Sequence, residues 1–93
     1  MKIYYGRRED YFNPESAFDK LVDNPPVTDE VTSYKDAVKW INKKAKELNK
    51  TVYYYNCNYS KKENWIEIDF GSWRDFIVLY DLTEENWKEF IGW

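Results

Sequence analysis

The residues best suited to chemistry are two carboxylates, Glu67 and Asp69, within the segment 65–70. If this segment is a β-strand, both carboxylates lie on one face, about 7 Å apart for a rise of roughly 3.3 Å per residue. Two carboxylates at that spacing suit an acid–base pair or a site for a hard cation. The same alternation is typical of a solvated strand face, and Arg74 is expected to pair with Asp69 across a hairpin. We therefore predict no catalytic residues, no metal site and no cofactor.

The rest of the chain lacks the usual catalytic motifs. It contains no histidine, so the commonest general base and the commonest zinc ligand are missing. Its three glycines, at positions 6, 71 and 92, cannot form a phosphate-binding loop or a dinucleotide fingerprint. The single cysteine, Cys57, has no visible activating neighbour, so we predict a buried or half-buried bystander. The protein is accordingly predicted not to be an enzyme.

The N-terminal half of the chain carries signals for one strand and two helices. Residues 2–5 are predicted to form a short strand. A helix is predicted over residues 14–22, because Asn13 can cap it, Pro14 suits the first helical position, and two further prolines end it. A longer helix begins near Ser33, and Asn49 favours a left-handed end. Its apolar positions repeat at spacings of three and four residues: Val38, Ile41, Ala45 and Leu48.

The C-terminal half predicts three strands and a last helix. Residues 51–59 and 65–70 have strand composition, and a third strand over 73–82 follows Gly71-Ser72, which suits a two-residue hairpin turn. Thr83 caps a short helix with an apolar side of Trp87, Phe90 and Ile91. The predicted fold is α+β in the order β-α-α-β-β-β-α, as one domain over residues 1–93. Its sheet is an antiparallel three- to four-stranded meander with helices packed on one face.

The two faces of the predicted sheet differ in composition. The face with Ile66, Ile68, Phe70, Ile77 and Leu79 is expected beneath the helices. The opposite face mixes acids with large aromatic rings, which suit a partner-binding surface where carboxylates steer association and rings anchor it. The residues of this predicted surface are Trp65, Glu67, Asp69, Arg74, Phe76 and Tyr80. The alternative is that some of the tryptophans, Trp73 and Trp87 foremost, belong to the core.

Charge is unevenly distributed along the chain, whose net charge is −3. Residues 32–62 hold eight basic and two acidic side chains, whereas residues 63–93 hold two basic and eight acidic ones. Five lysines at spacings of four, four, three and four fall on one stripe of the long predicted helix: Lys35, Lys39, Lys43, Lys46 and Lys50. This stripe is either a solvated helix face or a contact for phosphates or an acidic protein.

From Ser33 onward, the predicted order of helix, three strands and helix resembles that of a double-stranded-RNA-binding domain. In that family the last helix begins with a basic cluster, whereas Thr83-Glu84-Glu85-Asn86 stand at the corresponding positions here. We therefore do not expect this protein to share the function of that family. In general character the chain is similar to small phage inhibitors of host nucleases, including anti-CRISPR proteins, and to toxin-immunity proteins. They are likewise short, acidic, poor in cysteine and without catalytic motifs.

These observations favour a binding role. We expect a non-catalytic inhibitor or adaptor of a protein partner, such as an anti-CRISPR-like phage inhibitor of a host defence nuclease. The alternatives are a toxin-immunity protein and a nucleic-acid-binding module that uses the lysine stripe. No segment approaches the roughly 20 apolar residues that cross a bilayer, so no membrane association is expected. A cytoplasmic location, in a bacterium or in the host cell of a phage, fits the single cysteine.

Overall fold

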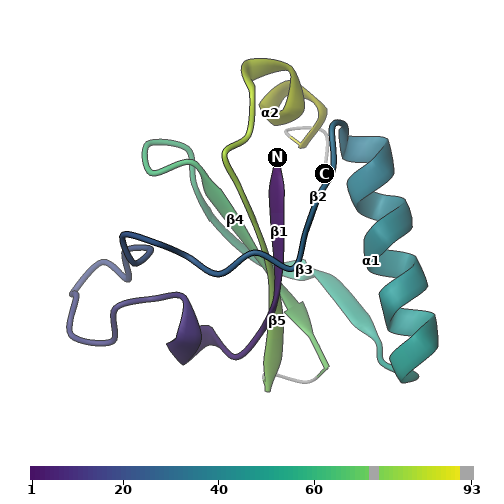
Figure 1. Cartoon of the computed structure of the whole chain (residues 1–93), viewed down its shortest axis with the longest axis horizontal. Helices are drawn as coiled ribbons and strands as arrows, with labels where there is room; N and C mark the ends of the chain where they lie inside the picture. The colour runs from purple at the N-terminus through teal and green to yellow at the C-terminus, as the bar shows by residue number, and fades with distance from the viewer. Residues whose placement is uncertain (72–73, 91–93) are drawn as a thin grey trace.

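The computed structural model describes residues 1–71 and 74–90, without the side chains of residues 54–56. Its centre is a five-stranded antiparallel sheet in the order β2-β1-β5-β4-β3 (Figure 1). The strands are β1 (Lys2–Gly6), β2 (Asp29–Glu30), β3 (Val52–Ser60), β4 (Trp65–Phe70) and β5 (Asp75–Tyr80). The helices are α1 (Tyr34–Leu48), α2 (Glu84–Phe90) and a short 3-10 helix, η1 (Arg8–Asp10). The predicted α+β class, the strand predicted over residues 2–5 (β1) and the β3–β4–β5 meander are confirmed, and β2 is a fifth strand beyond the predicted three or four.

Helix α1 begins and ends where the sequence predicts. The Ser33 hydroxyl accepts a hydrogen bond from the backbone N–H of Asp36 at 3.2 Å, which caps the first turn. At the other end Asn49 adopts the left-handed conformation, with φ 53° and ψ 48°. The buried stripe of this helix consists of Ala37, Ile41 and Ala45. The stripe therefore lies slightly toward the N-terminus of the predicted one, and Leu48 is 41% exposed.

The main core lies between the two helices and one face of the sheet. The sheet contributes the five predicted apolar residues, Ile66, Ile68, Phe70, Ile77 and Leu79, all at most 2% exposed. From α2, Trp87 and Phe90 pack into the same cluster. The Thr83 hydroxyl caps α2 by accepting from the backbone N–H of Asn86 at 3.2 Å. The prediction that the helices share one face of the sheet is thus confirmed, while Trp73 and Ile91 lie outside the described residues.

The predicted helix over residues 14–22 does not form. The Asn13 side chain accepts from the backbone N–H of Glu15 at 3.0 Å, which makes a tight turn in place of a helix cap. The chain then folds back, and the backbone N–H of Val22 donates to the carbonyl of Tyr11 at 3.1 Å. Long-range packing overrides the local signal, because the consecutive residues Tyr11 and Phe12 are both buried, at 0% and 1% exposure.

We call residues 7–28 the strap, because this segment covers the second face of the sheet. Figure 1 shows it, in purple and blue, on the opposite side of the sheet from α1. Tyr11 and Phe12 of the strap form a second core with Trp65, Phe76, Val78 and Tyr80. The Tyr80 hydroxyl also donates to the carbonyl of Pro26 at 2.8 Å. This face is therefore enclosed between strap and sheet.

The prediction that this second face is exposed is wrong. Of its six predicted contact residues only Arg74 is exposed. The other five are at most 6% exposed: Trp65, Glu67, Asp69, Phe76 and Tyr80. Alternation along the strands correctly separates the two faces, but burial of large rings is favourable on either face once a second layer is present. The strap supplies that layer.

The hairpin between β4 and β5 has a different register from the predicted one. Asp69 lies opposite Phe76, and Phe70 lies opposite Asp75, so four residues connect the strands in place of two. Arg74 therefore does not face Asp69 in the ladder. The observed register places Ile68 opposite Ile77, whereas a two-residue turn would have placed an acid there. The shift is by two residues, which explains why the side chains of β4 and β5 keep their predicted faces.

Candidate functional site

The two carboxylates first considered for chemistry, Glu67 and Asp69, are buried, each 1% exposed. Glu67 Oε2 accepts from Arg8 Nε at 3.0 Å and from the Tyr11 hydroxyl at 2.9 Å. Its other oxygen accepts from Asn58 Nδ2 at 3.4 Å. Burial and the negative charge of Glu67 raise the pKa of Tyr11, so this hydroxyl stays protonated and keeps donating. Glu67 therefore joins strap to sheet, and no exposed carboxylate pair exists at these positions.

The Cys57 thiol is half-buried, as predicted. Burial and the negative charge of Glu67 raise its pKa to about 11. The thiol is therefore almost entirely protonated at neutral pH. A protonated thiol is a weak nucleophile and a weak metal ligand.

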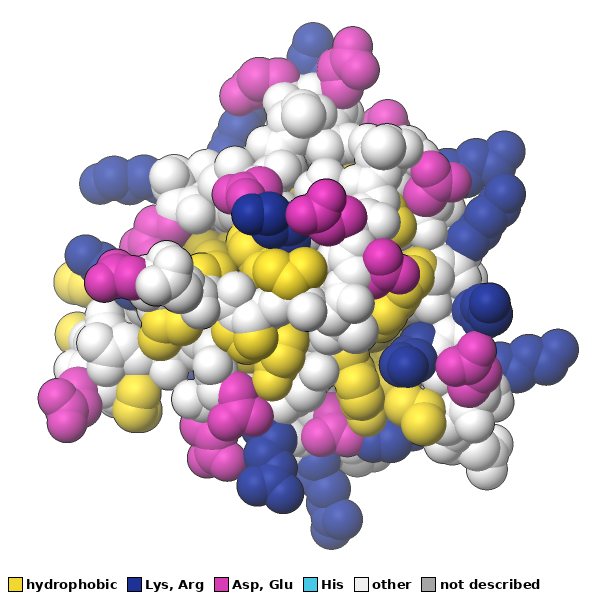
Figure 2. Space-filling model, viewed as in Figure 1, with side chains coloured by type: hydrophobic (Ala, Val, Ile, Leu, Met, Phe, Trp, Pro, Cys, Tyr) yellow, Lys and Arg dark blue, Asp and Glu magenta, His cyan; other side chains and the backbone are white. Residues whose placement is uncertain are grey.

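Four of the five predicted lysines form an exposed face on α1: Lys35, Lys39, Lys43 and Lys46. We call these four residues the lysine face. Dark blue side chains project along the α1 side of the molecule in Figure 2. Within the described part of the chain, none of the four forms an ion pair with a carboxylate. Lys50 differs, because it donates to Asp75; this bond raises the pKa of Lys50 and lowers the pKa of Asp75.

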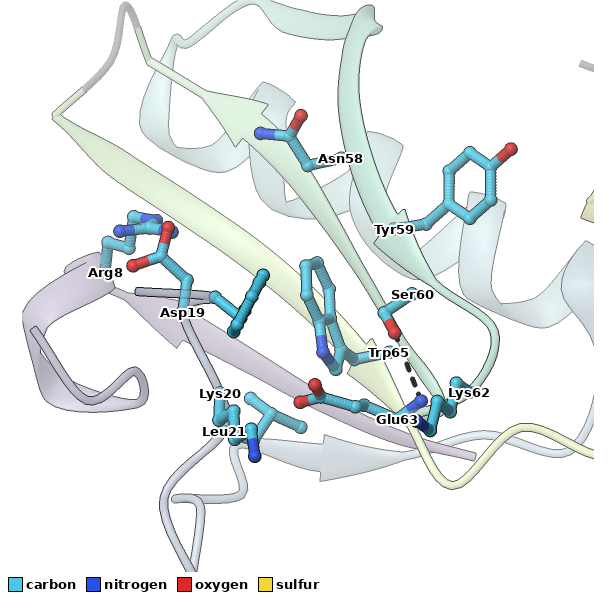
Figure 3. A pocket seen from close by; sticks show the side chains of 11 residues that line it. Arg8, Asp19, Lys20, Leu21, Asn58, Tyr59, Ser60, Lys62, Glu63 and Trp65 are labelled. Atoms are coloured by element: carbon cyan, nitrogen blue, oxygen red, sulfur yellow. Dashed lines mark hydrogen bonds and ion pairs between the residues drawn. The ribbon is translucent and has the colours of Figure 1, made fainter. Parts of the chain in front are cut away.

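An open groove of about 1050 Å³ lies between the strap and the β3–β4 hairpin (Figure 3). We call it the strap–hairpin groove. The strap lines it with Arg8, Phe18, Asp19, Lys20 and Leu21. The hairpin lines it with Asn58, Tyr59, Ser60, Lys62, Glu63 and Trp65. Figure 3 shows the Trp65 indole between the Asp19–Leu21 stretch and Ser60, while the Tyr59 ring points away from it. The Tyr59 ring instead lies near Trp87, with centroids 6.2 Å apart.

Two aromatic side chains that line this groove differ in their exposure to solvent. Phe18 is 78% exposed, whereas Trp65 is 6% exposed and packs edge-on against Phe12, with ring centroids 4.9 Å apart. Trp65 Nε1 is buried and has no hydrogen-bond partner among the described residues. A buried donor without an acceptor costs roughly 1–3 kcal/mol. The groove thus combines an exposed apolar ring with a donor that lacks an acceptor from this chain.

Both rings have the opposite environment from the one the sequence predicts. Phe18 falls on the apolar side of the predicted helix over residues 14–22, with Ala17, Leu21 and Val22, whereas Trp65 is predicted on an exposed sheet face. No local pattern marks the groove, because its walls come from segments that are distant in sequence. The only local signal is composition: nearly half of the apolar residues are aromatic, more than a small core easily buries.

Comparison with protein-family models, curated proteins and solved structures finds no significant match. No helix within residues 1–71 and 74–90 is long and apolar enough to span a membrane. The same residues contain no cluster of three or more cysteine, aspartate or glutamate side chains arranged to hold a metal ion.

Proposed function

We propose that this protein is a non-catalytic binding protein that engages a protein partner at Phe18 and the strap–hairpin groove. The observation that carries the proposal is the 78% exposure of Phe18 beside a groove with an unpartnered buried donor. Large aromatic residues next to a concave surface are typical of the anchors that dominate binding energy.

The local backbone supports presentation of this ring. Ser16 accepts from the backbone N–H groups of both Phe18 and Asp19, each at 3.3 Å. Asp19 adopts a left-handed φ of 48°, which reverses the chain directly after Phe18. Arg8 then forms an ion pair with Asp19, tying the turn to the rest of the strap. A ring held on a fixed turn loses less conformational freedom on binding than one on a free loop.

A binding protein of this kind acts as an inhibitor or an adaptor by occupying the surface of its partner. We propose a nucleic-acid-processing enzyme as the partner, as for an anti-CRISPR-like phage inhibitor; a toxin bound by an immunity protein is the alternative. What supports a basic partner is the acidic surface of α2, where Glu84, Glu85 and Glu89 are exposed. Exposed carboxylates attract a basic channel and accelerate association.

Replacement of Phe18 by serine tests the proposed surface. We expect Phe18→Ser to weaken capture of a stoichiometric protein from a lysate of the source cells at least tenfold, as loss of an aromatic anchor does. Val27→Ser is the matched control, because Val27 is a 49% exposed apolar residue of the same strap outside the groove. Captured protein is quantified by mass spectrometry at several bait concentrations. Equal loss, or no loss, in the two variants would contradict the proposal.

A second candidate function is nucleic-acid binding through the lysine face. The observation that favours it is the exposure of Lys35, Lys39, Lys43 and Lys46 without an acidic partner among the described residues. Successive members three or four residues apart rise by roughly 4.5 or 6 Å along a helix. That spacing can follow phosphates along one strand, and each neutralised phosphate adds to the salt dependence of binding.

A double charge reversal tests this second candidate. If the lysine face binds nucleic acid, Lys39→Glu with Lys43→Glu should reduce retention of duplex RNA or single-stranded DNA at least tenfold at low salt. Lys88→Glu is the control, since it changes an exposed lysine of α2 without touching the lysine face. Retention is measured by filter binding over a series of salt concentrations. Failure of the unmodified protein to retain either nucleic acid would exclude this function.

A further inference from the structure

We infer that the strap–hairpin groove takes an extended, acidic segment of the protein partner. When that segment binds, the side chains that cover Trp65 Nε1 move apart and a backbone carbonyl of the segment accepts from this atom, while a carboxylate lies against Lys20 and Lys62. This inference rests on the proposed function, because it specifies which part of a partner enters the groove.

The Trp65 side chain defines the first requirement for a ligand. An indole N–H can only donate, so the missing partner must be an acceptor. A polypeptide segment offers a carbonyl acceptor at every residue, whatever its side chains. Phe18 lines the same groove and provides an apolar contact for a side chain of that segment. The two features together fit a peptide with a carbonyl and an apolar side chain close to each other.

The charges of the groove define the second requirement. Arg8 is neutralised by Asp19 of the strap and by Glu67 of the sheet. Lys20 and Lys62 are exposed and form no ion pair with a described carboxylate. Glu63, which is half-buried, is the remaining acid in the lining. Two available cations against one acid favour a ligand that carries negative charge.

The position of β3 defines the conformation of the ligand. β3 is the last strand at one edge of the sheet, and its residues Asn58–Ser60 line the groove. An edge strand presents backbone groups that an extended segment can pair with. A single-stranded nucleic acid fits less well, because nucleobases stack on exposed aromatic faces. Among the residues that line the groove, Trp65 is buried, and the Tyr59 ring, although 69% exposed, points away from Trp65 (Figure 3) and lies near Trp87. Phe18 is therefore the aromatic face that the lining offers inside the groove.

The Trp65 indole N–H resonance of ¹⁵N-labelled protein provides a direct test. Its assignment comes from its loss in Trp65→Phe. The probes are two pools of capped octapeptides that alternate random apolar residues with glutamate in one pool and with lysine in the other. We expect the glutamate pool to move this resonance downfield with at least tenfold higher affinity than the lysine pool. Lys20→Glu with Lys62→Glu should remove or reverse that preference.

Other outcomes separate this inference from the proposed function. An unmoved resonance, or equal response to the two pools, would overturn the acidic segment even if Phe18→Ser abolished partner capture. A response to oligothymidylate with none to the peptides would assign the groove to nucleic acid and also overturn it. A response to the glutamate pool with capture unchanged in Phe18→Ser would support the peptide site while refuting Phe18 as the anchor.

Discussion

Replacement of Glu67 by alanine should lower the free energy of unfolding by about 3 kcal/mol. The Tyr11 hydroxyl, buried with its ring, would lose the acceptor that now lies 2.9 Å away. An unsatisfied buried hydroxyl costs roughly 1–3 kcal/mol, and the space left by the missing side chain adds a cavity term. Arg8 would also lose one of its two carboxylate partners, a smaller effect because Asp19 remains. Urea denaturation followed by tryptophan fluorescence measures the change.

Two comparisons test whether the loss of stability comes from the buried contacts of Glu67. Glu85→Ala removes an exposed carboxylate from α2 and should change stability by less than about 0.5 kcal/mol. In a Tyr11→Phe background, where no hydroxyl needs an acceptor, Glu67→Ala should cost about 1 kcal/mol less than in the unmodified protein. Equal destabilisation by Glu67→Ala and Glu85→Ala would show that Glu67 does not hold the strap.

Replacement of Phe12 by alanine should be at least as severe, lowering the free energy of unfolding by about 3–5 kcal/mol. Phe12 is 1% exposed, lies against Trp65, and has the Arg8 guanidinium 4.7 Å from its ring centroid. Phe18→Ala changes the same residue type in the same strap, but this ring is 78% exposed. Its effect on stability should stay below about 0.5 kcal/mol. Urea denaturation of both variants makes the comparison direct.

Hydrogen exchange shows which part of the molecule loses stability in each variant. In Phe12→Ala, backbone amides of the strap and of β5 should exchange faster, because that substitution opens the second core. In Phe18→Ala the exchange pattern should match that of the unmodified protein. If the two variants had similar stabilities, the strap would not be an integral layer of the fold.

Local signals predict the elements whose geometry is determined locally. Ser33 and Asn49 delimit α1 through local hydrogen bonds. The Ser33 hydroxyl accepts from a backbone N–H of the first turn, and the backbone N–H of the left-handed Asn49 donates to carbonyls of the last turn. Alternation in β4 and β5 predicts the two faces of the sheet because successive side chains of a strand point to opposite faces. The lysine face follows from helical periodicity alone. Lys50 leaves that face because α1 ends at Leu48 and the Lys50 ammonium group pairs with Asp75 of β5, a contact that helical spacing cannot reveal.

The features that the sequence does not predict depend on contacts between distant residues. Residues 13–15 have the composition of a helix start, but burial of Tyr11 and Phe12 against the sheet fixes the strap in another conformation. β2 is only Asp29–Glu30 and owes its existence to pairing with β1. The strap–hairpin groove likewise depends on contacts between segments that are distant in sequence. Phe18 and Trp65 acquire their opposite exposures only once the strap covers the second face.

The position of β1 has a consequence for biosynthesis. Of the five strands, β1 comes first in the sequence but lies inside the sheet, where Lys2–Gly6 pairs with β5, the last of the five. The loss of entropy on closing so long a loop grows only slowly with its length, but such distant pairing slows folding. The sheet therefore closes only after residues 75–80 have cleared the exit tunnel. Until then the aromatic N-terminal segment has no native partner on β5, and a chaperone that shields it would raise the yield of folded protein.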